Sequence, residues 1–425
     1  MIDHSKFLRD LFDCAVEAAD PMRSLAAHLP AKPMLGEGRL VVIGAGKASA
    51  RMAEAVEAAW GPCEGLVITR YGYGRPCKGI EIVEANHPVP DTAGQVATER
   101  MLDLLDGLGA QDMVLALISG GASSLLVAPC EGITLEEKKS VNKALLASGA
   151  PIDRMNTLRK HLSRVKGGQL AMRAYPAPMH CLMISDVPGD DPAYIGSGPT
   201  VGDPSTPQEA LEVLQRWRID APRSVIEALR RGSGVVAPDD PRLCAVTNEI
   251  YAAPAQSLEA AAQLAKERIA GLDVRMLGDA LEGEAREIAA RHAQLARDIQ
   301  SKRAPDDAPV LLLSGGELTV TRRGDGIGGP NAEYCLALAV ALDGAEGIHA
   351  LAGDTDGVDG AAEVAGAVVS PHSLVKARAR QVDPQEALSR NDAHCFFEAI
   401  GDQVVTGPTL TNVNDFRAIL IEAKA

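Results

Sequence analysis

Two short turns in this chain have the composition of an oxyanion-binding site, and each follows an apolar run. Val310 to Leu313 ends in Ser314-Gly315-Gly316-Glu317, and Val114 to Ile118 ends in Ser119-Gly120-Gly121-Ala122-Ser123. An apolar run of this length predicts a buried strand. A glycine-rich turn behind it leaves backbone N–H groups free to bind phosphate. The sequence therefore predicts two phosphate-binding turns, as a site built from two α/β units requires.

A third glycine turn carries a lysine. Arg39 to Ile43 predicts a strand, Gly44-Ala45-Gly46-Lys47-Ala48 a turn, and Ala50 to Trp60 a helix. This arrangement presents N–H groups to an anion. Ser49 stands where a dinucleotide fingerprint has its third glycine, and a P-loop is not matched either. The glycines alone could serve close packing, but Lys47 favours an anionic ligand, because a lysine opposes the dipole at a helix N-terminus.

Acidic residues follow two other predicted strands. His180 to Ser185 leads into Asp186-Val187-Pro188-Gly189-Asp190-Asp191, and Ile348 to Ala352 leads into Gly353-Asp354-Thr355-Asp356-Gly357. Carboxylates at such strand ends lie where open α/β sheets bind ligands. They could hold Mg²⁺ or take a proton from a hydroxyl. The alternative is turn formation, in which Asp beside Gly and Pro is common.

Basic and amide side chains concentrate between 138 and 168, including Lys138, Asn142, Arg159, Lys160 and Lys166. Such a cluster is either a solvated face or an anion pocket, and the net charge of −15 favours the pocket. His87, in a loop fixed by two prolines, is a candidate substrate contact whose alternative role is capping.

The bulk composition bounds the function. A chain of 425 residues exceeds what one core usually supports. We expect an N-terminal domain at 1–238 and a C-terminal domain at 239–425, with the boundary in the Arg230 to Pro241 linker. The acidic charge and an aromatic content of 3% argue against nucleic acid and anionic membranes as partners. Eight scattered cysteines predict reduced thiols. No signal peptide or membrane span is apparent, so we expect a cytoplasmic protein. We also expect its ligand to be small.

The remaining elements follow from periodicity and caps. Asp91 or Thr92 caps a helix that runs to about Leu108, and the first residues form an amphipathic helix. Further strands are expected at 66–69, 80–84, 243–246 and 274–277, and further helices at 257–270 and 282–302.

Taken together, the ordered motifs resemble the MOFRL-type glycerate kinase family. They are Gly44-Ala45-Gly46-Lys47-Ala48, Ser119-Gly120-Gly121, Asn156-Thr157-Leu158-Arg159-Lys160-His161, Ile184-Ser185-Asp186-Val187-Pro188-Gly189-Asp190, Gly196-Ser197-Gly198-Pro199-Thr200, Ser314-Gly315-Gly316-Glu317, Gly353-Asp354-Thr355-Asp356-Gly357 and Thr411-Asn412-Val413-Asn414-Asp415. The resemblance implies two unlike α/β domains with mainly parallel sheets and an active site in the cleft. It also implies phosphorylation of D-glycerate that depends on ATP and Mg²⁺, in bacterial members usually at the 2-hydroxyl. Some members are labelled hydroxypyruvate reductase, so an NAD(P)H-dependent reductase is the alternative, and a homodimer is left open.

By position, the family's catalytic lysine matches Lys47, and the acid after its Asp-Val-Pro-Gly turn matches Asp190. We expect Arg159, Lys160, Ser123 and His87 to bind substrate, and Asp186, Asp354 and Asp356 to bind metal. The expected nucleotide-binding residues are Gly44, Gly46, Ser119, Gly120, Gly121, Ser314, Gly315, Gly316, Glu317 and Asn331.

One position departs from the family pattern. Many members carry arginine where this chain has Pro330, so an arginine role cannot be transferred here. Two alternatives follow: Arg322, Arg323 or Lys160 substitutes for it, or this branch prefers a related hydroxy acid. The Gly-Gly-Pro-Asn form resembles the members linked to tartrate degradation.

Overall fold

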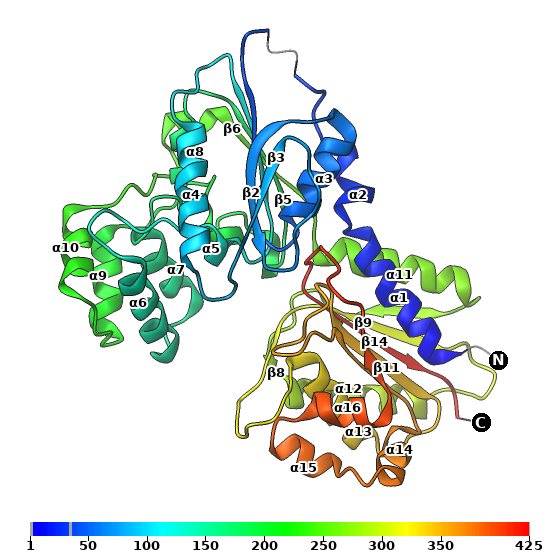
Figure 1. Ribbon diagram of the computed structural model, residues 1–425. Helices are drawn as coiled ribbons and strands as arrows, with labels where there is room; N and C mark the ends of the chain where they lie inside the picture. Colours follow the sequence, from blue (N-terminus) through cyan, green and yellow to red (C-terminus); the bar gives the residue numbers. More distant parts are fainter. Residues whose placement is uncertain (1–2, 34–35, 425) are drawn as a thin grey trace. The chain divides into compact units, whose positions relative to one another are not determined.

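The computed structural model describes residues 3–33 and 36–424, which form two compact units. The N-terminal unit comprises Asp20–Asp186 and Asp190–Tyr251. The C-terminal unit comprises the described residues of Met1–Ala19, Val187–Gly189 and Ala252–Ala425. Figure 1 labels helices and strands in each unit where there is room. Within the described residues, no helix combines the length and the apolar character needed to cross a membrane.

The N-terminal unit is built on a six-stranded sheet with the order β3-β2-β1-β4-β5-β6. The strands are β1 (Leu40–Ala45), β2 (Glu64–Arg70), β3 (Ile80–Ala85), β4 (Met113–Ile118), β5 (Met179–Ile184) and β6 (Val246–Ala252). β1, β4 and β5 are parallel neighbours, and Ala45 aligns with Ile118, which aligns with Met183. The carboxyl ends of these three strands therefore lie side by side at one edge, where open α/β sheets bind ligands.

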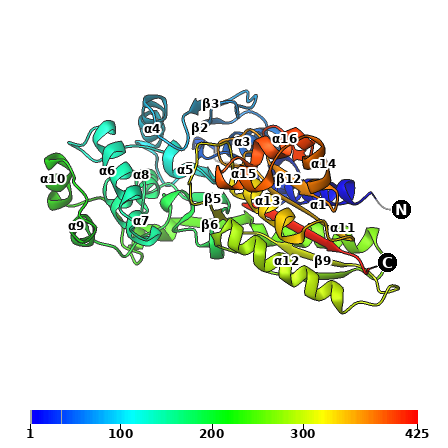
Figure 2. The ribbon, with the colours of Figure 1, turned by 90° about the horizontal axis from the view of Figure 1, so that it is seen from below.

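Four helices of the N-terminal unit form a cluster with its own apolar core. They are α6 (Leu135–Ala147), α7 (Ile152–His161), α9 (Pro207–Arg216) and α10 (Arg223–Arg231), and Figures 1 and 2 show them gathered together. Their shared core includes Val141, Leu145, Leu158 and Leu229. This cluster holds α6 against α7 and so fixes the basic residues of both. The other helices are α2 (Pro21–Ser24), α3 (Ser49–Trp60), α4 (Thr92–Leu105), α5 (Ala122–Leu125) and α8 (Gln169–Ala174).

The C-terminal unit contains a second six-stranded sheet, with the order β13-β12-β11-β14-β9-β7. Its strands are β7 (Asp273–Met276), β9 (Val310–Ser314), β11 (Ile348–Asp354), β12 (Gly366–Val369), β13 (Gln403–Val404) and β14 (Asp415–Ile421). Only the β7–β9 pair is parallel, and the other four pairs are antiparallel. β8 (Gly283–Glu284) and β10 (Leu318–Thr319) form a separate short parallel pair.

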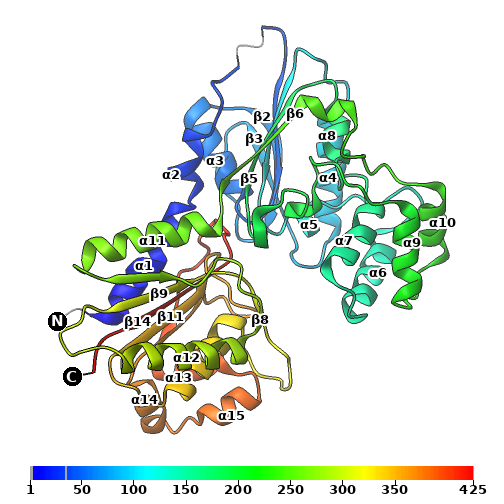
Figure 3. The same ribbon diagram turned by 180° about the vertical axis from the view of Figure 1, so that it is seen from behind.

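Alternating side chains of this second sheet pack against helices on both faces. Leu311 and Leu313 of β9 share a core with α1 (His4–Ala18) and α11 (Pro254–Arg268), which Figure 3 shows on one face. Val310 and Leu312 face the opposite core. That core is covered by α12 (Ala285–Ser301), α13 (Pro330–Leu342), α14 (Ser373–Ala379), α15 (Pro384–Ser389) and α16 (Ala393–Ile400).

The predicted α/β class is confirmed, and most predicted elements occur within a few residues of their expected bounds. Asp91 caps α4 by accepting the Gly94 N–H at 2.9 Å, as expected. Mainly parallel pairing holds in the N-terminal unit, whereas the second sheet is mixed. The predicted strand at 243–246 is wrong: Asp240 caps a 3₁₀ turn over Pro241–Ala245, and the strand begins only at Val246.

The segment predicted as a linker packs on the N-terminal unit. Val236 N–H donates to Gly167 O at 3.0 Å, and Asp203 N–H donates to Val236 O at 2.8 Å. β6 then completes the first sheet before the chain enters the C-terminal unit at Ala252. The compact units therefore divide the chain later than 238/239, and the N-terminal helix α1 belongs to the C-terminal unit.

Candidate active site

The turn after β1 carries Lys47, and the neighbouring turn after β4 fixes its shape. Gly46 has a φ of 141°, and a Cβ there would lie 2.1 Å from Ser119 Oγ, so only glycine fits. Lys47 N–H donates to Gly120 O at 2.8 Å, and Ala48 N–H donates to Ser119 Oγ at 3.1 Å. α3 begins directly behind this turn, so the half-buried Lys47 lies at the N-terminal end of a helix.

Two of the residues predicted to bind nucleotide lie inside this packing. Gly44 is within β1, where a Cβ would lie 2.5 Å from Leu117 O. Ser119 is fully buried, and its Oγ lies 3.1 Å from Ser49 Oγ. Gly44 therefore allows the close packing that was the alternative role of the glycines, and Ser119 bonds to the turn and helix start that follow β1.

A pocket of about 310 Å³ lies beside this turn, wholly within the N-terminal unit. His87, Gly121, Ser123 and Arg159 are among its lining residues. A Cβ at Gly121 would lie 3.1 Å from His87 Nε2 and 3.2 Å from Lys47 Cγ, so Lys47 reaches the same turn. The structure thus brings three of the four predicted substrate contacts to one pocket.

Three cations of the pocket wall point at neutral oxygen atoms. Lys138 Nζ donates to Leu162 O at 2.7 Å, Lys166 Nζ to Ser123 O at 2.7 Å, and Arg159 Nε to Asn142 Oδ1 at 2.8 Å. Among the residues described, no carboxylate lines this pocket. These three side chains therefore have no carboxylate partner in the pocket wall, which favours binding of an anion, whereas Lys139 of the same wall pairs with Glu136 at 2.9 Å.

Burial shapes the titration of these cations. It lowers the pKa of Lys138 to about 8, and it lowers the pKa values of Arg159 and Lys166, the latter strongly. A bound anion would favour the charged forms and raise these pKa values again.

Lys160 is the predicted substrate contact that the pocket does not include. Its side chain is 5% exposed and forms a short ion pair with Asp203, and its Nζ lies 5.6 Å from the centroid of the Tyr194 ring. A buried lysine paired in this way stabilises the packing of α7 against the segment that carries Asp203.

Asp186 and Asp190 follow β5 at the same sheet edge as the Lys47 turn. Asp190 adopts a left-handed conformation with a φ of 53°. Its Oδ1 atom is buried and has no hydrogen-bond partner among the described residues. Unpartnered buried carboxylate oxygens are rare in folded proteins, and this one is suited to a hydroxyl or a cation.

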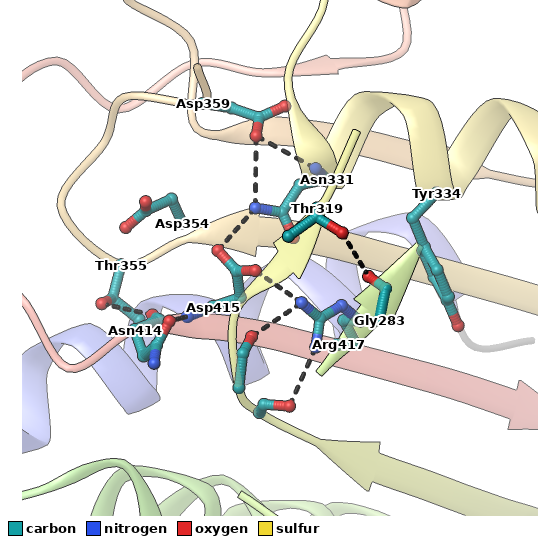
Figure 4. Close-up of polar contacts among 12 residues, drawn as sticks. Gly283, Thr319, Asn331, Tyr334, Asp354, Thr355, Asp359, Asn414, Asp415 and Arg417 are labelled. Atoms are coloured by element: carbon teal, nitrogen blue, oxygen red, sulfur yellow. Dashed lines mark hydrogen bonds and ion pairs between the residues drawn. The ribbon is translucent and has the colours of Figure 1, made fainter. Parts of the chain in front are cut away.

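Arg417 of β14, labelled in Figure 4, donates hydrogen bonds to the turn after β9. Arg417 Nη1 donates to Gly315 O at 2.9 Å, and Nη2 donates to Gly316 O at 2.8 Å. Gly316 has a φ of 93°, and a Cβ there would lie 2.1 Å from Leu281 N. The carbonyls of this turn are thus satisfied within the protein, while Glu317 is exposed.

A buried polar network joins Arg417 to the start of α13 (Figure 4). Arg417 pairs with Asp415, and Asp415 Oδ1 accepts from Asn331 Nδ2 at 2.7 Å. Asp359 accepts the N–H groups of Asn331 and Ala332 at 3.0 and 2.8 Å and so caps the helix. Burial raises the pKa of Asp415 to about 7, although Arg417 and Asn331 favour its ionised form.

These contacts leave Asn331, a predicted nucleotide-binding residue, only 1% exposed, so it orders the helix start within the protein. Ser314 is likewise buried.

Two predicted metal ligands lie at the end of β11: Asp354 is its last residue, and Asp356 is in the loop that follows. Asp354 Oδ1 accepts from Asp356 N–H at 2.9 Å, and Asp356 Oδ1 accepts from Val358 N–H at 2.8 Å, so both side chains shape the loop. Asp186 belongs to the N-terminal unit. The three predicted ligands therefore do not form a group within one unit.

Sequence reasoning missed Arg417 and gave no specific role to Lys138 and Lys166. The signal for Arg417 is a lone charge inside the apolar run 416–421. In the sequence, Lys138 and Lys166 could be recognised only as members of the basic cluster between 138 and 168.

The fold is that of a two-unit α/β protein with glycine turns and polar side chains at its strand ends, and comparisons with known proteins identify its family. Residues 310–415 match the MOFRL family, and residues 7–230 match a family described as a domain of unknown function, DUF4147. The crystal structure of a glycerate kinase from Thermotoga maritima superposes with a TM-score of 0.86 at 37% identity, covering 98% of this chain and 99% of that one.

Two curated relatives carry different names. A protein of Agrobacterium vitis named "Putative hydroxypyruvate reductase" is 53% identical, covering 97% of this chain and 94% of that protein. The D-glycerate 2-kinase of Thermotoga maritima is 39% identical, covering 94% of each chain. The chain belongs to the MOFRL/DUF4147 glycerate kinase family, as its motifs indicated.

Proposed function

We propose that this protein transfers the γ-phosphoryl group of ATP to the 2-hydroxyl of D-glycerate and forms 2-phosphoglycerate. The observation that carries the proposal is the pocket in which Lys138, Arg159 and Lys166 face neutral acceptors. Such a pocket suits a small anion, and a substrate carboxylate is the group we assign to it. The name of the Thermotoga maritima relative supports the same reaction.

In this mechanism the substrate carboxylate binds Arg159, and His87 and Ser123 contact the substrate hydroxyls. The unpartnered Asp190 Oδ1 accepts the hydrogen of the 2-hydroxyl. The hydroxyl oxygen then attacks the γ-phosphorus, its proton passes to Asp190, and the bond to the β–γ bridging oxygen breaks to release ADP. Lys47 neutralises charge on the transferring phosphoryl oxygens.

The carboxylates that follow β5 fit a hard cation, because Mg²⁺ prefers oxygen ligands. Asp186 is the residue we assign to Mg²⁺ in the N-terminal unit, and Asp354 and Asp356 are the candidates in the C-terminal unit. At these carboxylates Mg²⁺ would neutralise negative charge on the ATP phosphates. The turns at Gly120 and Gly315 are our candidates for the nucleotide phosphates.

The reductase remains a second candidate, since the 53% identical relative bears that name. A dinucleotide site would have a glycine in place of Ser49. Ser49 instead donates its buried hydroxyl to Leu117 O at 2.9 Å. This contact favours the kinase, because the strand-to-helix turn is built around a serine side chain.

Two assays on the same preparation separate these functions. One measures ADP release from ATP, Mg²⁺ and D-glycerate, with enolase added to convert 2-phosphoglycerate but not 3-phosphoglycerate. The other measures NADH or NADPH oxidation with hydroxypyruvate. We expect turnover in the first, with a product that enolase consumes. Turnover in the second alone would refute the kinase, and ADP release without enolase turnover would refute the 2-position.

A further inference from the structure

His4, His349 and Glu422 meet in the C-terminal unit, at the opposite end of β11 from Asp354. One ligand atom of each lies within 4.8 Å of the other two, and all three residues are half-buried. The two imidazole rings stack with centroids 4.1 Å apart, and His4 Nε2 lies 2.8 Å from Glu422 Oε1. Across the described part of the chain, no other trio of histidine, cysteine or acidic ligand atoms converges in this way.

The three residues lie close together because each is at the end of a strand or helix face that packs in the same apolar core. His349 lies two residues before Leu351 on β11 and aligns with Leu420 on β14, which lies two residues before Glu422. Side chains two apart on a strand share a face. Leu351 and Leu420 belong to the core that α1 covers, and His4 opens α1. The trio therefore lies at the rim of that core.

We propose that His4, His349 and Glu422 bind a divalent transition-metal ion, with Zn²⁺ as the best match, and that the ion fastens α1 to the sheet. Zn²⁺ takes imidazole nitrogen and carboxylate oxygen at about 2.1 Å, which places tetrahedral ligand atoms about 3.4 Å apart. His4 Nε2 and Glu422 Oε1, which lie 2.8 Å apart, would separate by about 0.6 Å, and a pair of ligand atoms 4.8 Å apart would approach by about 1.4 Å. Water supplies the fourth ligand.

The surroundings support ligation. Glu422 N–H donates to Gly347 O at 2.8 Å, and Gln300 Nε2 donates to Glu422 O at 3.0 Å, so the carboxylate extends from a fixed backbone. Two imidazoles disfavour Mg²⁺, which prefers oxygen ligands. The site is therefore independent of the magnesium of the proposed kinase.

Zinc binding to the chelator-treated full chain tests the proposal, with a zinc indicator dye as competitor. We expect one Zn²⁺ per chain that a hundredfold excess of Mg²⁺ does not displace. His349→Ala and Glu422→Gln should each weaken binding at least about tenfold. Amide hydrogen exchange in α1 should slow when Zn²⁺ is added to the unmodified protein and not to Glu422→Gln.

The matched control is His28→Ala, which removes a histidine that pairs with a single glutamate, Glu249, at 2.6 Å. It should bind Zn²⁺ as the unmodified protein does. Circular dichroism checks the folding of His349→Ala, and Glu422→Gln at the strand end provides the test if that variant does not fold. Equal affinity in Glu422→Gln and the unmodified protein, displacement by Mg²⁺, or loss of the site in His28→Ala would each overturn the proposal.

Discussion

Replacing Arg417 with methionine should release the turn after β9 and destabilise the C-terminal unit. Arg417 is 1% exposed and serves three acceptors, namely Asp415 and the carbonyls of Gly315 and Gly316. Removing one partner of a buried ion pair typically costs about 3–5 kcal/mol, because the other charge is left uncompensated. Methionine fills most of the volume, so we attribute the loss to charge and hydrogen bonds.

Hydrogen exchange measured by mass spectrometry reports this change locally. Peptides covering β9 and β14 should exchange about 100- to 5000-fold faster in Arg417→Met, since each 1.4 kcal/mol is a factor of ten. The increase in exchange rate caused by Arg417→Met should be smaller at pH 5 than at pH 8. Burial already raises the pKa of Asp415 to about 7, so at low pH this carboxyl is protonated and leaves no buried charge behind.

Two comparisons make the test specific. Arg417→Met combined with Asp415→Asn removes both charges and should be less destabilised than the sum of the single variants. Arg322→Met removes an exposed arginine of the same unit and should leave exchange in β9 and β14 unchanged. Unchanged exchange in Arg417→Met, or strict additivity in the double variant, would refute the reasoning.

Four further predictions concern other residues. Lys47→Met should lower kcat for glycerate phosphorylation by roughly 100- to 1000-fold while the apo melting temperature changes little; near-normal kcat would remove Lys47 from the mechanism. Arg159→Met should raise the KM for glycerate, whereas Lys160→Met should mainly lower the melting temperature, because it leaves its buried carboxylate partner unpaired; the reverse pattern would exchange their roles. Pro330→Arg should change KM or substrate preference and leave the fold intact, since Pro330 occupies the first position of α13, where an N–H is not needed; an unfolded variant would show that the proline is structural. Burial lowers the pKa of His292 to about 4, below the value of about 6.5 in an unfolded chain. The contribution of the neutral His292 to the free energy of unfolding is therefore complete above pH 6.5. It is lost as pH falls toward 4, by up to about 3 kcal/mol. His292→Gln should therefore lose less stability between pH 7 and pH 5, as denaturant unfolding at the two pH values would show.

The strand-end turns and the family can be predicted from the amino-acid sequence alone. β1, β4, β5 and β9 are short apolar runs that end in glycine or acidic residues, and local composition suffices to locate such strands and their turns. Lys47, Asp190 and the Ser-Gly-Gly motifs were found this way, because each lies within a few residues of a recognisable strand end.

Which of these residues are neighbours in space is known only from the tertiary fold. Arg159 and Lys160 are neighbours in sequence, yet one lines the pocket and the other pairs with Asp203, because adjacent residues on a helix point in different directions. β14 lies antiparallel between β9 and β11, and this position allows Arg417 to donate a hydrogen bond to Gly315 O in the Ser-Gly-Gly turn. Hydrophobic periodicity in the sequence carries no information on strand order. These contacts depend on pairing between strands far apart in the sequence, which no local sequence pattern encodes, so they could not be predicted.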